Sequence, residues 1–353
     1  MENVQTYLKQ AVEENASDLF LIAGKTVSMK KDGAIVSISD ERLMPKDSET
    51  LVRELYDMAN RPVDRCLSEG DDDFSLSVPG MARFRVNTYR QRGSLAAVIR
   101  IVSFGIPNWK ELDIPEEVMK IAQRTRGMVL VTGPAGGGKS TTLACIVDAV
   151  NNTRNAHIIT IEDPIEYLHR NNQSIISQRE LAMDTGSYVT ALRASLRQAP
   201  DVILLGEMRD LETIQTALTA AETGHLVIST LHTVGAVNTI DRIIDVFPPA
   251  QQQQVRVQLA QVLKTVVSQQ LLHTTDGKMA PAFEIMHLNN AVRTLVRESR
   301  IHQIDSVIQT SAAEGMIGMD ESILRLFKAG RITKETALHH AMNPDQLQKK
   351  LGK

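Results

Sequence analysis

The amino-acid sequence predicts an α/β protein in which a small α+β domain precedes a larger domain built on a parallel sheet. Three observations support this prediction. Apolar and polar residues alternate within the first hundred residues, short apolar runs alternate with helical patterns later in the chain, and a segment with glycine and proline separates the two regions. The 353 residues, 42% of them hydrophobic, are sufficient for two domains with separate cores.

The composition excludes several classes of protein. A net charge of −3 and an aromatic content of 4% provide neither a basic field nor a base-stacking surface, so no nucleic-acid partner is expected. Two cysteines cannot form a disulfide framework or a four-thiolate zinc site. No apolar run approaches the roughly 20 residues that span a bilayer. The sequence therefore predicts a cytoplasmic protein.

The first domain is predicted over residues 1–105. Its strands are indicated by alternating apolar residues and by the hairpin signal Asp32-Gly33. The period of two along the strand that contains Phe84 places Arg83 and Arg85 on the opposite face, away from the core. The expected elements are a helix at 4–14 and strands at 18–22, 26–31, 34–38, 74–78, 82–86 and 96–102.

The second domain is predicted over residues 116–285, after a linker at 106–115. Its short apolar runs are typical of parallel strands connected by helices. After Pro248 the pattern becomes wholly helical and continues so through a C-terminal region at 286–353. The expected strands are 128–132, 157–161, 202–205 and 226–230, and the expected late helices are 250–272, 291–300, 320–329 and 334–342.

A phosphate-binding loop is predicted after the first strand of the second domain. The sequence GPAGGGKST fits G-x-x-x-x-G-K-[ST], with an apolar strand before it and an amphipathic helix after it. Glycines allow main-chain N–H groups to converge on phosphate oxygens. Lys139 is expected to reach the β- and γ-phosphates of ATP, and Ser140 to bind Mg²⁺. The predicted nucleotide-binding residues are Gly133, Pro134, Ala135, Gly136, Gly137, Gly138, Lys139, Ser140 and Thr141.

Carboxylates follow the next two predicted strands. Glu162 and Glu166 follow one, and Glu207 follows the other. Because carboxyl ends of parallel strands line the ligand crevice, these side chains are expected near the phosphates. Glu207 is the candidate for orienting or deprotonating the attacking water, and Glu162 or Glu166 for holding the water network or Mg²⁺. The alternatives are a solvated helix-start acid for Glu207 and helix-capping acids for the other two.

Two histidines flank the fourth predicted strand. His232 follows it and is a candidate for contacting the γ-phosphate or positioning water, with a purely structural hydrogen bond as the equal alternative. His225 precedes the strand, at the end away from the phosphates, and is harder to place in the site. In the first domain, Asp71–Asp73 are expected in a solvated loop and not at a metal site.

Four segments together resemble the secretion-superfamily ATPases, which drive type II secretion, type IV pili and related machines. The segments read GPAGGGKST, IEDPIEYLH, LRQAPDVILLGEMRDLETIQTALTAAETGHLVISTLHT and TIDRIIDVFP. Taken together they contain, in order along the chain, the Walker A, Asp-box, Walker B and His-box motifs of that family. AVRTLVRE at 291–298 resembles a C-terminal motif of the same family. The resemblance covers nearly the whole chain.

The resemblance implies an architecture and an assembly. It implies a PAS-like N-terminal domain, a RecA-like P-loop ATPase domain with a helical C-terminal tail, and a homo-hexamer of such subunits. It also implies that the N-terminal domain donates arginines to the nucleotide. The candidates are Arg83, Arg85 and Arg100, and less securely Arg92; for each of them a solvated basic face is the alternative.

The function that the resemblance implies is a Mg-dependent ATPase that powers type IV pilus retraction and twitching motility. Its partner would be an inner-membrane platform protein, which would place the chain at the cytoplasmic face of the inner membrane. With two cysteines the chain lacks the four-cysteine zinc insertion of extension ATPases, which favours retraction. Alternatives are an accessory retraction ATPase, an assembly ATPase of a type IV pilus or type II secretion system, and a nucleotide-sensing scaffold, against which Glu207 argues.

Overall fold

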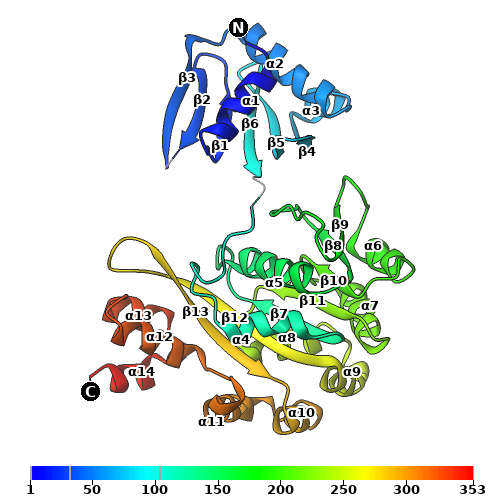
Figure 1. Cartoon of the computed structure of the whole chain (residues 1–353), viewed down its shortest axis with the longest axis vertical. Coiled ribbons are helices and arrows are strands. Elements are labelled where there is room, and N and C mark those ends of the chain that lie inside the picture. Colours follow the sequence, from blue (N-terminus) through cyan, green and yellow to red (C-terminus); the bar gives the residue numbers. More distant parts are fainter. Residues whose placement is uncertain (1, 32, 103–104, 353) are drawn as a thin grey trace. The chain divides into compact units, whose positions relative to one another are not determined.

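The computed structural model describes residues 2–31, 33–102 and 105–352. The chain divides into two compact units, each with its own sheet and hydrophobic core (Figure 1). The first unit comprises residues up to 105 together with the short segment 166–168, and the second comprises 106–165 and the residues from 169 onward. Both units combine helices with strands, so the predicted α/β class is confirmed.

The first unit contains an antiparallel sheet with the strand order β3-β2-β1-β6-β5-β4. Helices α1 and α2 contribute Leu8, Leu51 and Leu55 to its core, against Phe84 and Ile99 of the sheet. Asp32 of the expected hairpin turn lies outside the described residues. The elements are α1 (Val4–Glu13), β1 (Asp18–Leu21), β2 (Thr26–Lys31), β3 (Ala34–Arg42), α2 (Pro45–Met58), α3 (Asp64–Glu69), β4 (Asp71–Val78), β5 (Ala82–Gln91) and β6 (Ser94–Val102).

The predicted alternation along β5 is confirmed. Phe84 and Val86 are buried, whereas Arg83 is half-buried and Arg85 is exposed on the other face. Strand β5 pairs with β4 on one side and β6 on the other, so its pleat is fixed from both sides. The arginines therefore project from the sheet face that does not pack on the core.

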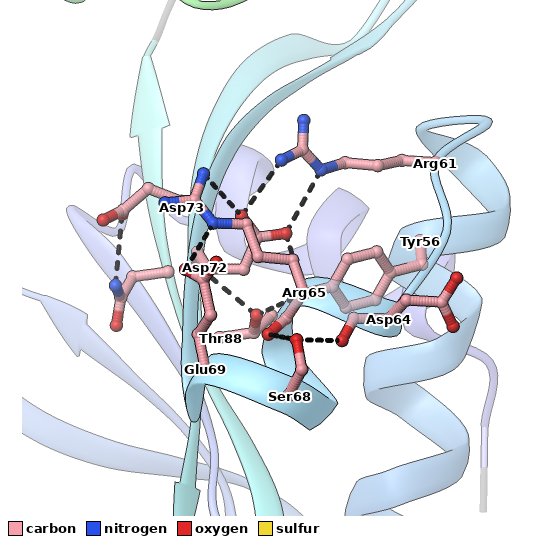
Figure 2. Close-up of polar contacts among 10 residues, drawn as sticks. Tyr56, Arg61, Asp64, Arg65, Ser68, Glu69, Asp72, Asp73 and Thr88 are labelled. Carbon is pink, nitrogen blue, oxygen red and sulfur yellow. Dashed lines mark hydrogen bonds and ion pairs between the residues drawn. The ribbon is translucent and has the colours of Figure 1, made fainter.

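The expected solvated loop at Asp71–Asp73 is wrong, because these residues begin strand β4. The same alternation that buries Phe74 turns Asp72 inward, and Asp72 is 2% exposed. Its two carboxylate oxygens accept bonds from the guanidinium of Arg61 at 3.0 and 3.1 Å, and one accepts a bond from the Tyr56 hydroxyl at 3.2 Å (Figure 2). A buried charge persists here because it is paired and hydrogen-bonded.

The second unit contains a seven-stranded sheet with the order β13-β12-β7-β11-β10-β8-β9, parallel except for β13. The four predicted strands of this domain are confirmed, and β9, β12 and β13 were not predicted. The strands are β7 (Gly127–Thr132), β8 (His157–Glu162), β9 (Ile175–Glu180), β10 (Val202–Leu205), β11 (Leu226–Leu231), β12 (Leu263–His273) and β13 (Met279–His287).

Helices cover both faces of this sheet (Figure 1). Along β7, Met128 and Leu130 join the core under α6–α10, while Val129 and Val131 join the core under α4, η1 and α5. Strands buried on both faces explain the continuous apolar runs in the sequence. The helices are α4 (Glu116–Met119), η1 (Lys120–Gln123), α5 (Lys139–Thr153), α6 (Tyr188–Ser195), α7 (Leu211–Glu222), α8 (Ala236–Asp245), α9 (Pro249–Val262) and α10 (Asn290–Arg297).

The long helix expected at 250–272 is wrong in its second half. Helix α9 ends at Val262, and the chain continues directly as strand β12, which lies between β7 and β13. The β-branched run Thr265–Val267 favours a strand at this point. Tertiary pairing with β7 then overrides the helical pattern of the glutamine-rich stretch.

The described residues beyond β13 form helices and one isolated bridge, in which Ile317 pairs with Ile285. Within the described part of the chain, no helix is both long and apolar enough to cross a membrane. These last helices are η2 (Ile301–Gln303), α11 (Ile304–Thr310), η3 (Ala312–Glu314), α12 (Met319–Lys328), α13 (Lys334–His340) and α14 (Pro344–Leu351).

Candidate active site

The predicted phosphate loop connects β7 to the first turn of α5. Gly136 and Gly138 have φ angles of 72° and 82°, in the left-handed region that favours glycine. At Gly133 a Cβ atom would lie 2.1 Å from the main-chain oxygen of Gln269, so no larger residue fits. The chain therefore forms a tight loop that directs main-chain N–H groups and the positive end of α5 to one point.

The Lys139 side chain lies inside this loop. It is buried, and its Nζ atom donates to the carbonyl oxygens of Gly133 and Pro134, at 2.8 Å each. A phosphate in the loop would meet this ammonium group, the loop amides and the start of α5 together. Ser140 is the next residue of α5, so its hydroxyl starts from the same helix turn.

Strand β12 forms one wall of the phosphate loop. This contact was not predicted from the sequence. The Gln269 side-chain oxygen accepts a 2.7 Å bond from the Thr142 hydroxyl on α5. A Cβ atom at Gly138 would lie 2.7 Å from the Gln269 side-chain nitrogen. Because the stretch was predicted as a helix, only the β-branched run before Gln269 could have indicated this contact.

The structure brings Glu207 and His232 together. Strands β10 and β11 are neighbours in the sheet, and each residue follows the carboxyl end of one of them. The Oε2 atom of Glu207 lies 3.4 Å from Nε2 of His232 and 2.6 Å from Nε of Arg209. Glu207 is 16% exposed in its side chain, whereas Arg209 is 73% exposed. The Glu207 carboxylate raises the pKa of Arg209.

The hydroxyl of Tyr188 lies close enough to three acidic side chains for their charges to affect it. Burial raises the pKa of its hydroxyl well above the usual value, and the nearby carboxylates of Glu207, Asp163 and Glu162 raise that pKa further. The Glu162 Oε1 atom accepts a bond from the Thr160 hydroxyl at 2.7 Å. Glu162 and Glu207 therefore influence the same group. No motif in the sequence distinguishes Tyr188, which begins helix α6.

Two candidates are not part of this group of side chains. Glu166 is exposed and belongs to the short segment grouped with the first unit. His225 lies at the opposite end of β11. Its Nδ1 atom is 2.9 Å from the carbonyl oxygen of Ala220, near the end of α7. Its own carbonyl oxygen accepts the main-chain N–H of Gly127. His225 therefore has a structural contact at that end of the sheet.

The candidate arginines of the first unit share one end of the β5–β6 hairpin, except for Arg92. Arg85 is paired directly with Arg100 across the two strands. Arg100 Nε lies 3.2 Å from a carboxylate oxygen of Asp18, and Arg83 donates to the Ser77 hydroxyl at 3.3 Å. Arg92 is in the turn at the other end of the hairpin, with φ 48°. Three guanidinium groups are thus presented together.

The order of phosphate loop, strand-end carboxylates and His232 agrees with one family of proteins. The model of the type II/IV secretion system protein family matches residues 1–340. The chain belongs to this family. The resemblance drawn from the sequence is therefore confirmed.

Relatives within this family match over most of their length. A Neisseria gonorrhoeae protein called "Twitching motility protein" is 51% identical over 276 residues, which are 78% of this chain and 74% of that protein. A Pseudomonas aeruginosa protein called "Type IV pilus retractation ATPase PilT" is 42% identical over 344 residues, which are 97% of this chain and 99% of that protein.

A solved structure in the family has the same fold. The structure described as "Crystal Structure of the Pilus Retraction Motor PilT and Bound ADP" has a TM-score of 0.91 at 43% identity and covers 99% of this chain and 100% of that chain. The predicted combination of an N-terminal domain with a RecA-like ATPase domain is therefore confirmed. The PAS-like character of the first unit stays a prediction.

Proposed function

We propose that this chain is a subunit of a ring-shaped motor that hydrolyses ATP to retract type IV pili. One observation carries the proposal. The phosphate loop with buried Lys139 follows strand β7, and the paired Glu207 and His232 follow strands β10 and β11 of the same sheet. Relatives called a twitching motility protein and a pilus retraction ATPase support it. The ADP in the similar solved structure supports nucleotide binding in the loop at 133–141.

In the proposed reaction the loop amides and Lys139 hold the β- and γ-phosphates. Glu207 orients a water molecule and accepts its proton as the oxygen attacks the γ-phosphorus, and ADP and phosphate are the products. His232 contacts Glu207 and would limit where that carboxylate points. Glu162 and Glu166 remain proposals for the surrounding water network.

Mg²⁺ would bind through Ser140. Within the described residues, no three or more His, Cys, Asp or Glu side chains are gathered to hold a metal ion. A single hydroxyl fits Mg²⁺, which usually takes its other ligands from substrate phosphates and water. When bound, the ion would neutralise charge that develops on the phosphate oxygens.

The active oligomer proposed here is a homo-hexamer in which arginines of the first unit reach nucleotide. Arg83, Arg85 and Arg100 are presented together at one end of a hairpin, which supports them over Arg92. A guanidinium near the departing γ-phosphate would stabilise the charge of the transition state. The measurement that tests this assembly is the mass of the purified protein with and without nucleotide.

Helix α10 is the proposed contact for an inner-membrane platform protein. Arg297 and Glu298 are exposed at its end, whereas Arg293 donates to the carbonyl oxygen of Ala260 within the same unit. An open groove of about 530 Å³ lies beside this helix. Its lining residues are Ala291, Thr294, Leu295, Gln303, Ser306 and Val307. Such a contact would hold the motor at the cytoplasmic face of the inner membrane.

A deletion strain tests the proposed function. Loss of the protein should leave abundant pili and abolish twitching, and the gene encoding Lys139→Ala should fail to restore twitching because that variant cannot bind ATP. A strain without pili would instead identify an assembly ATPase. Retained twitching with abundant pili would identify an accessory retraction ATPase, and a purified protein that binds ATP without Mg-dependent turnover would identify a scaffold.

A further inference from the structure

One buried carboxylate connects two helices that are far apart in the chain. Glu284 lies on strand β13 and is 6% exposed. Its Oε1 atom accepts the main-chain N–H of Ala236 at 2.6 Å, and its Oε2 atom accepts the N–H of Met319 at 3.3 Å. Ala236 is the first residue of α8, and Met319 is the first residue of α12. Both oxygens of Glu284 are therefore engaged by helix starts.

The residues before α8 form the segment 233–235, which directly follows His232. We call it the connecting segment. The N–H of Gly235 donates to the Ser268 hydroxyl on β12 at 2.9 Å, and the Gly235 carbonyl accepts a 2.7 Å bond from the Thr239 hydroxyl. Because Glu284 accepts the N–H of Ala236, the N–H groups of two consecutive residues, Gly235 and Ala236, are both hydrogen-bonded, and these bonds fix the end of the connecting segment. His232 is three residues away from this fixed point.

The chemistry of the position requires an acceptor-only group. The pKa of Glu284 is raised above its usual value, chiefly by burial and also by the nearby carboxylates of Asp305 and Asp320, and the N–H donors of Ala236 and Met319 oppose this rise. A carboxylate satisfies both donors and matches the positive ends of two helices. A glutamine of the same shape would turn an NH₂ group toward one of the two N–H groups.

The C-terminal helices are joined to the same carboxylate. Besides the bond at the start of α12, the two oxygens of Asp320 accept the N–H groups of Met342 and Asn343, at 2.6 and 2.9 Å, which fixes the start of α14 to α12. The Met342 side chain also reaches the connecting segment, because a Cβ atom at Gly235 would lie 3.1 Å from its terminal carbon. The chain after β13 therefore approaches the connecting segment in two ways: through Glu284, which bonds both the start of α12 and the residue that follows the segment, and through the Met342 side chain.

We propose that Glu284 is a positioning residue for ATP hydrolysis, which holds the connecting segment so that His232 contacts Glu207, and which ties that segment to the C-terminal helices. The inference rests on the roles proposed above for Glu207 and His232. The His232–Glu207 distance of 3.4 Å is at the long end of hydrogen-bond range, so a small displacement of the segment breaks the contact. Displacements of about 1 Å in an active site lower rates by up to about 10²-fold.

A double-mutant cycle on the full-length protein tests this inference. Glu284→Gln and His232→Ala are each expected to lower kcat by about tenfold or more, with KM for ATP within about twofold, because Lys139 and the loop are untouched. The double variant is expected to be no slower than His232→Ala alone, since Glu284 acts through His232. A multiplicative loss in the double variant, or an unchanged kcat in Glu284→Gln, overturns the inference.

Two further variants complete the experiment. Asp305→Asn removes a neighbouring charge that does not bond the connecting segment, and it should keep the kcat of the unaltered protein. If Glu284→Gln does not fold, Ser268→Ala loosens the same segment at Gly235, and it should lower kcat only while His232 is present. Unchanged kcat in His232→Ala contradicts both the inference and the proposed role of His232, whereas absence of turnover in the unaltered protein contradicts the proposed function itself.

Discussion

The Glu207 carboxylate lies 2.6 Å from the Arg209 guanidinium, two residues further along the chain. The carboxylate is largely buried and the guanidinium is largely exposed, so the arginine holds the acid from the solvent side. Since His232 approaches the same oxygen, one oxygen of Glu207 has two partners. The direction of the proposed catalytic carboxylate is therefore set by neighbours that follow two different strands.

Glu207→Gln is expected to bind ATP normally and to hydrolyse it about 10²–10⁴-fold more slowly. The amide keeps the shape of the side chain but cannot accept the proton of the attacking water. Nucleotide binding by fluorescence and single-turnover hydrolysis separate the two effects. Near-normal turnover would exclude Glu207 from the reaction.

Arg209→Ala is expected to lower kcat by roughly three- to tenfold while nucleotide affinity stays the same. The substitution removes one orienting partner of Glu207 and leaves His232 in place. Arg193→Ala is the matched control, because Arg193 forms an equally short surface ion pair with Glu212 that involves no candidate site residue. An equal loss in both variants would show that the effect is not specific to Glu207.

Arg83→Ala is expected to lower turnover of the full-length oligomer by at least about tenfold without changing ATP affinity. The residue lies at the end of the β5–β6 hairpin that also presents Arg85 and Arg100. Arg92→Ala, in the turn at the opposite end, is the control and should hydrolyse ATP at the normal rate. If Arg83→Ala does so as well, the side chain has no role beyond the surface of the first unit.

Asp72→Asn is expected to destabilise the first unit by about 2–3 kcal/mol. The change removes the buried carboxylate that pairs with the half-buried guanidinium of Arg61 (Figure 2). Asp73→Asn is the control, because Asp73 is exposed and bonds only the side chain of Asn87 among the described residues. Urea unfolding followed in both variants provides the comparison, and equal midpoints would contradict the structural role of Asp72.

The features predicted correctly from the sequence are those with local signals. The phosphate-loop motif is a contiguous pattern, and Glu207 and His232 each follow a strand that the sequence predicts, β10 and β11. The roles of these two residues stay predictions. Gln269, Tyr188 and Asp72 were missed or misplaced, because their roles depend on which distant segment packs against them. The helical pattern before β12 extended past Val262, and only pairing with β7 shows where the strand begins.

Strand β12 places three consecutive side chains against three different parts of the second unit. Ser268 bonds the connecting segment, Gln269 bonds α5, and Gln270 donates to the carbonyl oxygen of His340 on α13. Deleting one residue of this strand before Ser268 would turn all three side chains to the opposite faces of the sheet. In the turn that follows, Thr275 bonds Arg331 through its main-chain N–H and Gly330 through its hydroxyl. The exposed tip of that turn, residues 276–278, is therefore the suitable point for inserting a fluorescent label or an affinity tag into a functioning protein.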